Sequence, residues 1–341
     1  MVRIAMGTLW WVSGCIGLTL LPIASFANEN VRLRDPAESD FYNQFPSVID
    51  QLDSVLQRTE TECDAICGDL AGWRYVAGRD HHNLANAGAR DWYVLPDGLL
   101  WHSYLAGPHE PRISTVIFND TDNGVFWDAT LGGRVGLIRY GTFGAKDPRG
   151  LQWDLEGAVA TRLDLHHAED VESMDYRFGT EITAAEGRWA MKFGYFHISS
   201  HVGDEYMVRN PLFQRTNYVT ESWVIGLRYA ATESIQVYGE MANAFSTSGG
   251  AKRYQYQTGF EYTPIATSFR TGAPFAAVNL NFREAVNYDV STTVQFGWAF
   301  QGLESQRRFR VGLQYAEGPT SQYEFFTRRE EYIGVGVWFD Y

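Results

Sequence analysis

The last ten residues of the chain, Tyr332-Ile333-Gly334-Val335-Gly336-Val337-Trp338-Phe339-Asp340-Tyr341, carry the clearest strand pattern in the sequence. Successive side chains of a β-strand point to opposite faces, so every second residue shares a face. The other face includes two glycines and Asp340, whereas one face is entirely apolar, with Ile333, Val335, Val337, Phe339 and Tyr341. The pattern predicts a strand with one face in an apolar environment and an aromatic residue at its end.

Segments of similar texture recur upstream, each about ten residues long, rich in Tyr, Trp, Phe, Val and Gly, and separated by turn residues. An even strand number is typical of single-chain bacterial outer-membrane barrels. The sequence therefore predicts an all-β fold, an antiparallel transmembrane β-barrel of about 12 strands over residues 112–341. The expected strands are 112–118, 125–138, 150–163, 173–185, 187–198, 218–230, 234–245, 252–263, 274–283, 291–301, 307–316 and 331–341.

Two alternatives to the barrel are less well supported. A helical membrane span needs roughly 18 or more consecutive apolar residues, and no segment after residue 27 supplies them. A spanning chain must then close into a barrel. A water-soluble β-sandwich also alternates, but its strands are usually shorter and need not end on an aromatic residue.

Residues 1–27 are expected to form a signal peptide of a Gram-negative-type bacterium. Arg3 precedes an apolar stretch that reaches Leu21, and Ser25-Phe26-Ala27 fits a small-x-small cleavage site. A lipoprotein signal at Cys15 is the alternative, but the most continuous apolar run follows Cys15 rather than preceding it. Export to the outer membrane is the expected route, with barrel assembly machinery and outer-membrane lipids as partners.

Cleavage after Ala27 removes Arg3 and leaves 28 − 1 = 27 basic against 41 acidic residues, a net charge of 27 − 41 = −14. That charge opposes binding to nucleic acid phosphates, so no nucleic-acid partner is expected. The sequence leaves the oligomeric state open.

Residues 28–111 are expected to form an N-terminal periplasmic segment, or one that packs against the barrel end, with one short helix at Ser47–Arg58. Cys63 and Cys67 lie in a polar part of it. A local disulfide is favoured over a free pair. A zinc site would need more ligands than this pair supplies.

Charged residues of both signs share the other face of the predicted strands, which must then line the lumen. Paired long side chains in a twelve-strand barrel predict a narrow or closed lumen. The inward set is Asp128, Arg134, Asp154, Glu156, Asp175, Arg177, Glu181, Lys192, Arg228, Glu240, Arg253, Glu261, Arg283, Arg308 and Arg310. Both barrel ends are periplasmic when the strand number is even, so the long connections 199–217 and 317–330 are expected outside the cell.

His197 and Ser199 are the candidate catalytic pair. Counting by twos from Trp189 puts both on the lipid-facing side near the outer leaflet, about 7 Å apart between Cα atoms. A histidine there could deprotonate the serine, while Glu221 or Asn217 on the next strand could orient the imidazole. The alternative is that these residues have no catalytic role and belong to an extracellular rim, where His, Ser and Glu are common.

Three residues that follow, His201, Asp204 and Glu205, form a candidate loop site. Calcium is a candidate cofactor, and the metal ligands are not defined by the sequence. Asp120-Thr121-Asp122-Asn123-Gly124 hints at a calcium loop but lacks the downstream glutamate, and is expected to be a hairpin turn.

Several strings occur in order between about Trp92 and Tyr341. They are Leu99-Leu100-Trp101, Ser103-Tyr104-Leu105-Ala106-Gly107-Pro108, Trp127-Asp128-Ala129-Thr130-Leu131-Gly132-Gly133-Arg134, Ser199-Ser200-His201-Val202-Gly203-Asp204-Glu205 and the aromatic end. Together they resemble the domain-of-unknown-function 1207 family of outer-membrane proteins. The resemblance implies an outer-membrane location and brings no established reaction.

A shorter likeness joins His197-Ile198-Ser199 to outer-membrane phospholipase A and to the lipid A 3-O-deacylase barrels, which also carry H-x-S on an outward face. The resemblance implies acyl ester hydrolysis at the outer leaflet, with an asparagine or glutamate orienting the histidine: Asn210, Asn217 and Glu221 are eligible. Ser200 stands where those enzymes have asparagine. The functional hypothesis is a serine-histidine lipid hydrolase, a phospholipase or lipid A deacylase, and the alternative is a non-enzymatic barrel acting as a narrow solute transporter or structural or adhesion protein.

Overall fold

The computed structural model describes residues 89–264 and 270–341, which belong to the unit Gly72–Tyr341 of the two into which the chain divides. The expected signal peptide, the helix expected at Ser47–Arg58 and the pair Cys63 and Cys67 lie outside the described residues. None of the helices in the described part is long and apolar enough to cross a membrane.

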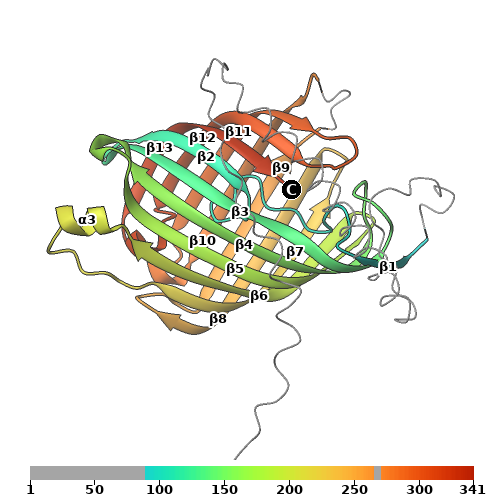
Figure 1. The fold of residues 1–341 in the computed structure, drawn as a ribbon, viewed down its shortest axis with the longest axis horizontal. Coiled ribbons are helices and arrows are strands. Elements are labelled where there is room, and N and C mark those ends of the chain that lie inside the picture. The colour runs from blue at the N-terminus through green and yellow to red at the C-terminus, as the bar shows by residue number, and fades with distance from the viewer. Residues whose placement is uncertain (1–88, 265–269) are drawn as a thin grey trace, which may run out of the picture. The chain divides into compact units, whose positions relative to one another are not determined.

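The described unit is one antiparallel sheet that closes on itself (Figure 1). Each strand from β2 to β13 pairs with its neighbours along the chain, and β13 pairs with β2 from Phe339 opposite Ile113 to Tyr332 opposite Asp120. The strands are β2 (Ile113–Asp120), β3 (Gly124–Gly141), β4 (Gly150–Asp164), β5 (Asp170–Glu186), β6 (Trp189–Val202), β7 (Val219–Ala230), β8 (Ile235–Ser248), β9 (Tyr254–Tyr262), β10 (Ala273–Arg283), β11 (Val290–Gln301), β12 (Arg308–Pro319) and β13 (Arg329–Asp340).

The twelve predicted strands are therefore confirmed, each within a few residues of its expected bounds. Short helical segments occupy four of the connections: η3 (Leu165–His167), α3 (Asp204–Arg209), η4 (Glu284–Val286) and η5 (Tyr323–Phe325). The predicted turn at Asp120 is confirmed as well, because the Asp120 carboxylate accepts hydrogen bonds from the backbone N–H groups of Asp122 and Asn123.

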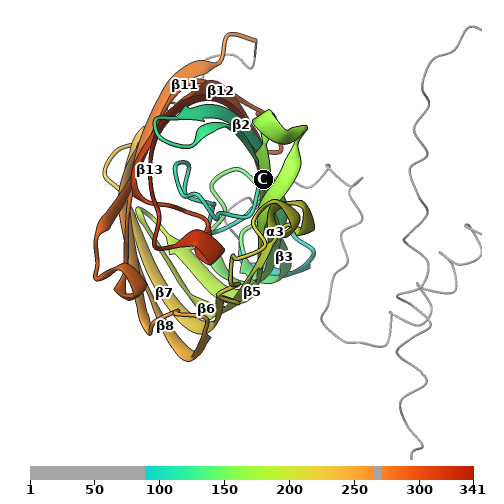
Figure 2. The same ribbon diagram turned by 90° about the vertical axis from the view of Figure 1, so that its left-hand side faces the viewer.

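The barrel unit begins before the expected boundary at residue 112. An extra strand, β1 (Asp91–Val94), pairs with the end of β3 from Gly141 to Ile138. Residues 99–112 then lie within the ring of strands (Figure 2), with Trp101, Tyr104 and Leu105 almost completely buried. Residues 99–111 of this luminal segment belong to the stretch 28–111 that was expected in the periplasm or packed against the barrel end.

Polar contacts with the barrel wall explain why the luminal segment lies there. The Arg112 guanidinium donates to the carbonyl oxygens of Tyr104 and Leu105. The Leu105 N–H donates to Glu261 Oε1 at 2.7 Å, and the Tyr104 hydroxyl donates to Glu240 Oε2 at 2.9 Å. Buried backbone groups and carboxylates are thus satisfied by each other.

The two predicted faces are confirmed. Ile333 and Val335 are 60% and 59% exposed on the outer surface, whereas Asp154 and Arg310 on the inner surface are 1% and 0% exposed. An apolar outer surface is stable against lipid tails and not against water. Arg253 was expected to point inward but is exposed, because it lies just before the first residue of β9 at the rim.

Many of the inward charges form ion pairs with one another in the lumen. Arg134 contacts Glu156 and Glu181, and Lys192 Nζ lies 3.1 Å from Glu181 Oε1 and 2.7 Å from Glu240 Oε2. Further pairs join Arg162 to Asp128 and Glu330, Arg177 to Glu156, and Arg310 to Asp340. The loop between β12 and β13, red in Figure 2, also turns into the ring of strands. Buried ion pairs of this density fit the expected narrow or closed lumen.

Candidate active site

The strands β6 and β7 bring His197 and Glu221 side by side on the outer surface. The two residues are direct cross-strand partners, and His197 Nδ1 lies 2.9 Å from Glu221 Oε1. Their side chains are 31% and 28% exposed. The pair is partly shielded but open to a molecule that approaches along the outside of the barrel.

The contact between these two residues selects one form of the imidazole. An ionised carboxylate can only accept hydrogen bonds, so Nδ1 of His197 must carry the proton that Glu221 accepts. In the neutral ring, Nε2 is then left with a free lone pair. This is the tautomer that a general base acting on a hydroxyl requires.

Tyr195 holds Glu221 from the other side. Its hydroxyl donates to Glu221 Oε2, so the two carboxylate oxygens are shared between Tyr195 and His197. Tyr195 precedes His197 by two residues on β6 and therefore shares its face. A carboxylate with both oxygens engaged has less rotational freedom than one with a single partner.

Ser199 continues the same face of β6 beyond His197. It lies between Tyr176 on β5 and Val219 on β7, and its side chain is half-buried. Among the described residues its hydroxyl has no hydrogen-bond partner, so the contact from Ser199 to His197 is not formed in this state. Catalytic hydrogen bonds are often long in the free enzyme and shorten when substrate binds.

Irregular strand geometry and aromatic rings surround the pair. The register of β7 and β8 shifts between Glu221 and Ser222, and such bulges often re-aim side chains next to active sites. Phe245 of β8 lies on the bulged stretch, with its ring 5.5 Å from that of Trp223. Tyr195 also packs edge-on against Trp223 at 6.1 Å. Aromatic residues of this kind gather at the boundary between lipid and water.

Asn217, the other expected orienting residue, is not brought to His197. It precedes β7 in a left-handed conformation with φ 53°, and its backbone N–H donates to Glu324 Oε1 at 3.2 Å. β7 begins at Val219, so Asn217 lies outside the strand and does not pair with β6. Asn210 is also elsewhere, because its side-chain amide donates to the Tyr206 carbonyl in the helix α3. Of the three eligible residues, Glu221 makes the contact.

The expected loop site spans the end of β6 and the start of α3. His201 Nδ1 lies 3.3 Å from an Arg215 nitrogen, and its ring packs edge-on against Tyr176 at 5.4 Å. Asp204 and Glu205 occupy the first turn of α3 and are exposed. Within residues 89–264 and 270–341, no group of three or more His, Cys, Asp or Glu side chains could hold a metal ion.

The structure shows contacts of Tyr195, Ser200 and His109 that the sequence did not predict. Tyr195 could have been found from its parity with His197. Ser200 points the opposite way, into the lumen, where its hydroxyl donates to Asp175 and Asp175 Oδ2 lies 2.8 Å from His109 Nε2. His109 could not have been placed beside Asp175, since its segment shows no strand pattern.

Several solved structures are similar to part of this chain. The outer membrane phospholipase A from Escherichia coli is 10% identical over 67% of this chain and 90% of that chain, with a TM-score of 0.44. The Salmonella typhi outer membrane phospholipase dimer with bound calcium is 12% identical over 67% of this chain and 91% of that chain, with a TM-score of 0.46. The KdgM porin is 10% identical over 67% of this chain and 99% of that chain, with a TM-score of 0.40. Likenesses at these identities do not extend to function.

No curated protein matches the sequence. A family model does match it, from residue 81 to residue 341, under the description protein of unknown function (DUF1207). The matched range contains every strand of the barrel, the luminal segment and the pair His197 and Glu221. The resemblance found in the sequence is thereby confirmed, and the chain belongs to the DUF1207 family.

Proposed function

We propose that this barrel is a serine hydrolase that cleaves acyl esters of lipids in the outer leaflet of the outer membrane. The observation that carries the proposal is the 2.9 Å contact between His197 Nδ1 and Glu221 Oε1 on the lipid-facing surface, two residues from Ser199. Polar and ionisable side chains are costly on a lipid-facing surface, and their presence there invites a functional explanation.

Each residue takes one role in the reaction. The Ser199 oxygen attacks the ester carbonyl carbon while His197 Nε2 accepts the hydroxyl proton, and Glu221 stabilises the imidazolium that forms. The bond from the carbonyl carbon to the alcohol oxygen then breaks, and His197 returns the proton to that oxygen. The alcohol product leaves and the acyl group remains on Ser199. In the second half of the reaction a water molecule attacks the acyl carbon while His197 Nε2 accepts its proton. The bond to the Ser199 oxygen then breaks, His197 returns the proton to that oxygen, and the fatty acid leaves.

The position of the pair favours an amphipathic substrate. Below it lie exposed apolar side chains such as Phe193 and Trp223, 6.0 Å apart between ring centroids. An acyl chain could lie along these rings while its ester reaches the boundary where His197 lies. Phospholipids and lipid A both present acyl esters at that depth.

Localisation in the outer membrane belongs to the same proposal. The apolar outer surface and the closed antiparallel sheet are the features by which a protein spans that membrane. The expected signal peptide would export the chain and the barrel assembly machinery would insert it.

The experiment compares purified wild-type barrel with Ser199→Ala and His197→Ala in mixed micelles, using phospholipid and lipid A esters with and without calcium. We expect each variant to lose most of the activity and the double variant to lose no more, because members of one catalytic unit do not contribute additively. Ser248→Ala, at the exposed end of β8, is the matched control and should keep wild-type activity.

Either of two results would contradict the proposal: a folded wild-type barrel that is inactive on every lipid tested, or activity unchanged in Ser199→Ala. Both would favour the non-enzymatic alternative. One observation supports an adhesive role, since Val208 and Leu212 in the loop between β6 and β7 are 80% and 94% exposed. A narrow transporter would instead give a steady ion current across a planar bilayer.

A further inference from the structure

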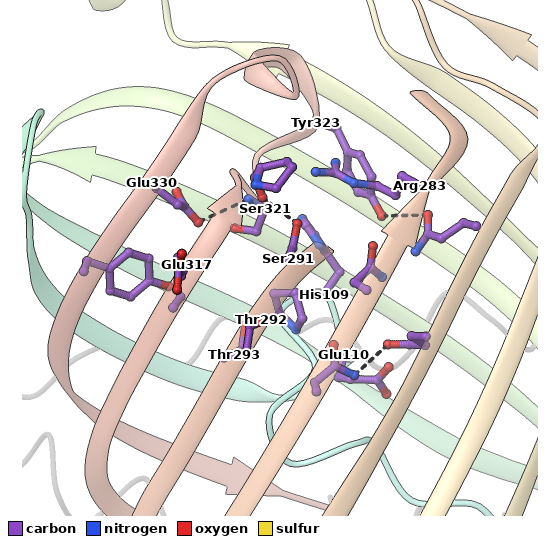
Figure 3. A pocket seen from close by; sticks show the side chains of 18 of the residues that line it. His109, Glu110, Arg283, Ser291, Thr292, Thr293, Glu317, Ser321, Tyr323 and Glu330 are labelled. Carbon is purple, nitrogen blue, oxygen red and sulfur yellow. Dashed lines mark hydrogen bonds between the residues drawn. The ribbon is translucent and has the colours of Figure 1, made fainter. Parts of the chain in front are cut away.

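A small cavity lies in the lumen between the luminal segment and the loop that joins β12 to β13 (Figure 3). Its volume is about 40 Å³. His109 and Glu110 line it from the luminal segment, Arg283 and Thr293 from β10 and β11, and Tyr323 from the loop. The cavity faces inward and is separate from the candidate active site on the outer surface.

Arg283 is the unusual residue of this cavity. It is 4% exposed, yet among the described residues it has no carboxylate within ion-pair distance. Its Nη2 donates to the Thr320 carbonyl oxygen at 2.7 Å, and its guanidinium carbon lies 5.4 Å from the centre of the Tyr323 ring. A buried cation without a counter-charge is costly, so an anion beside it would be stabilising.

Asn281 and Thr293 line the same cavity as Arg283, and both side chains are largely buried. Neither side chain makes a hydrogen bond within the part of the chain that the structure describes. Their polar atoms are not fully enclosed, because the enclosed side-chain atoms without a partner in that part belong to Trp101, Arg112, Arg134 and Arg228. A polar ligand in the cavity could therefore reach the hydrogen-bonding groups of Asn281, Thr293 and Arg283.

Most of the other charged residues around the cavity have partners, and Glu317 accepts a hydrogen bond from the Tyr315 hydroxyl at 3.1 Å. Arg162 pairs with Glu330 at 2.7 Å, and Arg177 pairs with Glu156 at 2.7 Å. Glu110 Oε2 accepts a hydrogen bond from the Tyr104 N–H at 3.2 Å. Among the described residues, Arg283 is thus the lining arginine that has no carboxylate partner.

The size of the cavity limits what it can hold. A water molecule needs about 10–15 Å³ by this measure, so 40 Å³ corresponds to about three waters or to one compact oxyanion. We propose that the cavity binds a small oxyanion of the size of phosphate or acetate, with Arg283 as its anchor. Arginine suits this role because its planar fork matches phosphate and carboxylate oxygens.

The loop above the cavity explains how the anion would be retained. Tyr323 stacks on His109 at 4.5 Å and on Tyr218 at 4.8 Å between ring centroids. Its backbone N–H donates to Asp175 Oδ2 at 3.2 Å. Together these contacts hold the ring over the cavity, so the bound anion is shielded from bulk water.

The test is calorimetric titration of the full-length barrel in detergent with inorganic phosphate, then with acetate, at fixed ionic strength. We expect saturable binding of at least one of the two by wild type. Arg283→Gln should weaken it by about tenfold to a hundredfold, the range for losing a hydrogen bond to a charged group. Arg283→Lys should bind the anion with an affinity between those of wild type and Arg283→Gln, because lysine keeps the positive charge but lacks the planar fork of donors. Citrate, which is too large for the cavity, should not compete.

Arg308→Gln is the matched control, since Arg308 faces the separate cavity at the other end of the barrel. Heat-modified mobility on a gel verifies that each variant is folded. No saturable binding of phosphate or acetate to folded wild type would overturn the proposal, as would equal affinity in Arg283→Gln. Loss of binding in Arg308→Gln with retention in Arg283→Gln would also overturn it. None of these outcomes depends on lipid hydrolysis.

Discussion

Replacing Glu221 by glutamine should slow acyl ester hydrolysis about tenfold while the barrel remains folded. The amide oxygen can still accept the proton on His197 Nδ1, so the tautomer is preserved, but the negative charge that stabilises the imidazolium is lost. Hydrogen bonds to charged groups contribute about 1.5–3 kcal/mol and neutral ones about 0.5–1.5 kcal/mol.

The exposure of the pair reduces that difference. The two side chains are 31% and 28% exposed, so water screens part of the charge. We therefore expect a rise of about 1.4 kcal/mol in the activation free energy, which is tenfold in rate. The assay is initial-rate hydrolysis of phospholipid in mixed micelles under saturating conditions, with Glu205→Gln in the exposed turn of α3 as the matched control.

Unchanged activity in Glu221→Gln would refute the role of the carboxylate. Losses that multiply when Glu221→Gln is combined with Ser199→Ala would also refute it, because a residue that acts through the nucleophile has no effect once the nucleophile is gone.

Three further predictions concern positioning, closure and the lumen. Tyr195→Phe should reduce the catalytic rate by less than Glu221→Gln does, because Glu221 keeps its contact with His197. The same lipid assay measures this, and a larger loss than in Glu221→Gln would contradict it. Deleting Phe339–Tyr341 should leave an unpaired edge and misassembled protein, so a normal heat-modified band in the outer membrane would contradict the closure argument. Lys192→Met should destabilise the barrel by about 3–5 kcal/mol, because it leaves the buried carboxylate of Glu240 without its cation and Glu181 with Arg134 alone. Urea unfolding in detergent measures this, and stability equal to wild type would contradict it.

Local alternation was enough to predict the twelve strands, since each strand repeats every two residues along its own length. The luminal segment could not be predicted in that way. Its position depends on contacts such as Leu105 N–H to Glu261 and Arg310 to the Leu105 carbonyl, between residues more than a hundred positions apart. Such contacts leave no periodic signal in the sequence.

The candidate site was partly predictable for a related reason. Parity alone put His197 and Ser199 on one face. The choice between Glu221 and Asn217 depended on where β7 begins after a long loop, and loop length does not fix register. The inward direction of Ser200 followed from parity, but its partner Asp175 did not, because that contact requires the register of β5 against β6.

The contacts of the luminal segment have a consequence for the order in which the protein can reach its native state. Arg112 Nη1 lies 3.5 Å from Asp340 Oδ1, and His102 Nδ1 lies 3.4 Å from the backbone oxygen of Tyr341. The first of these contacts reaches β13, and the second joins residues 239 positions apart. The luminal segment therefore cannot take its native position before β13 has closed the ring of strands. The interior and the wall of the barrel must then form in one cooperative step, not one after the other along the chain.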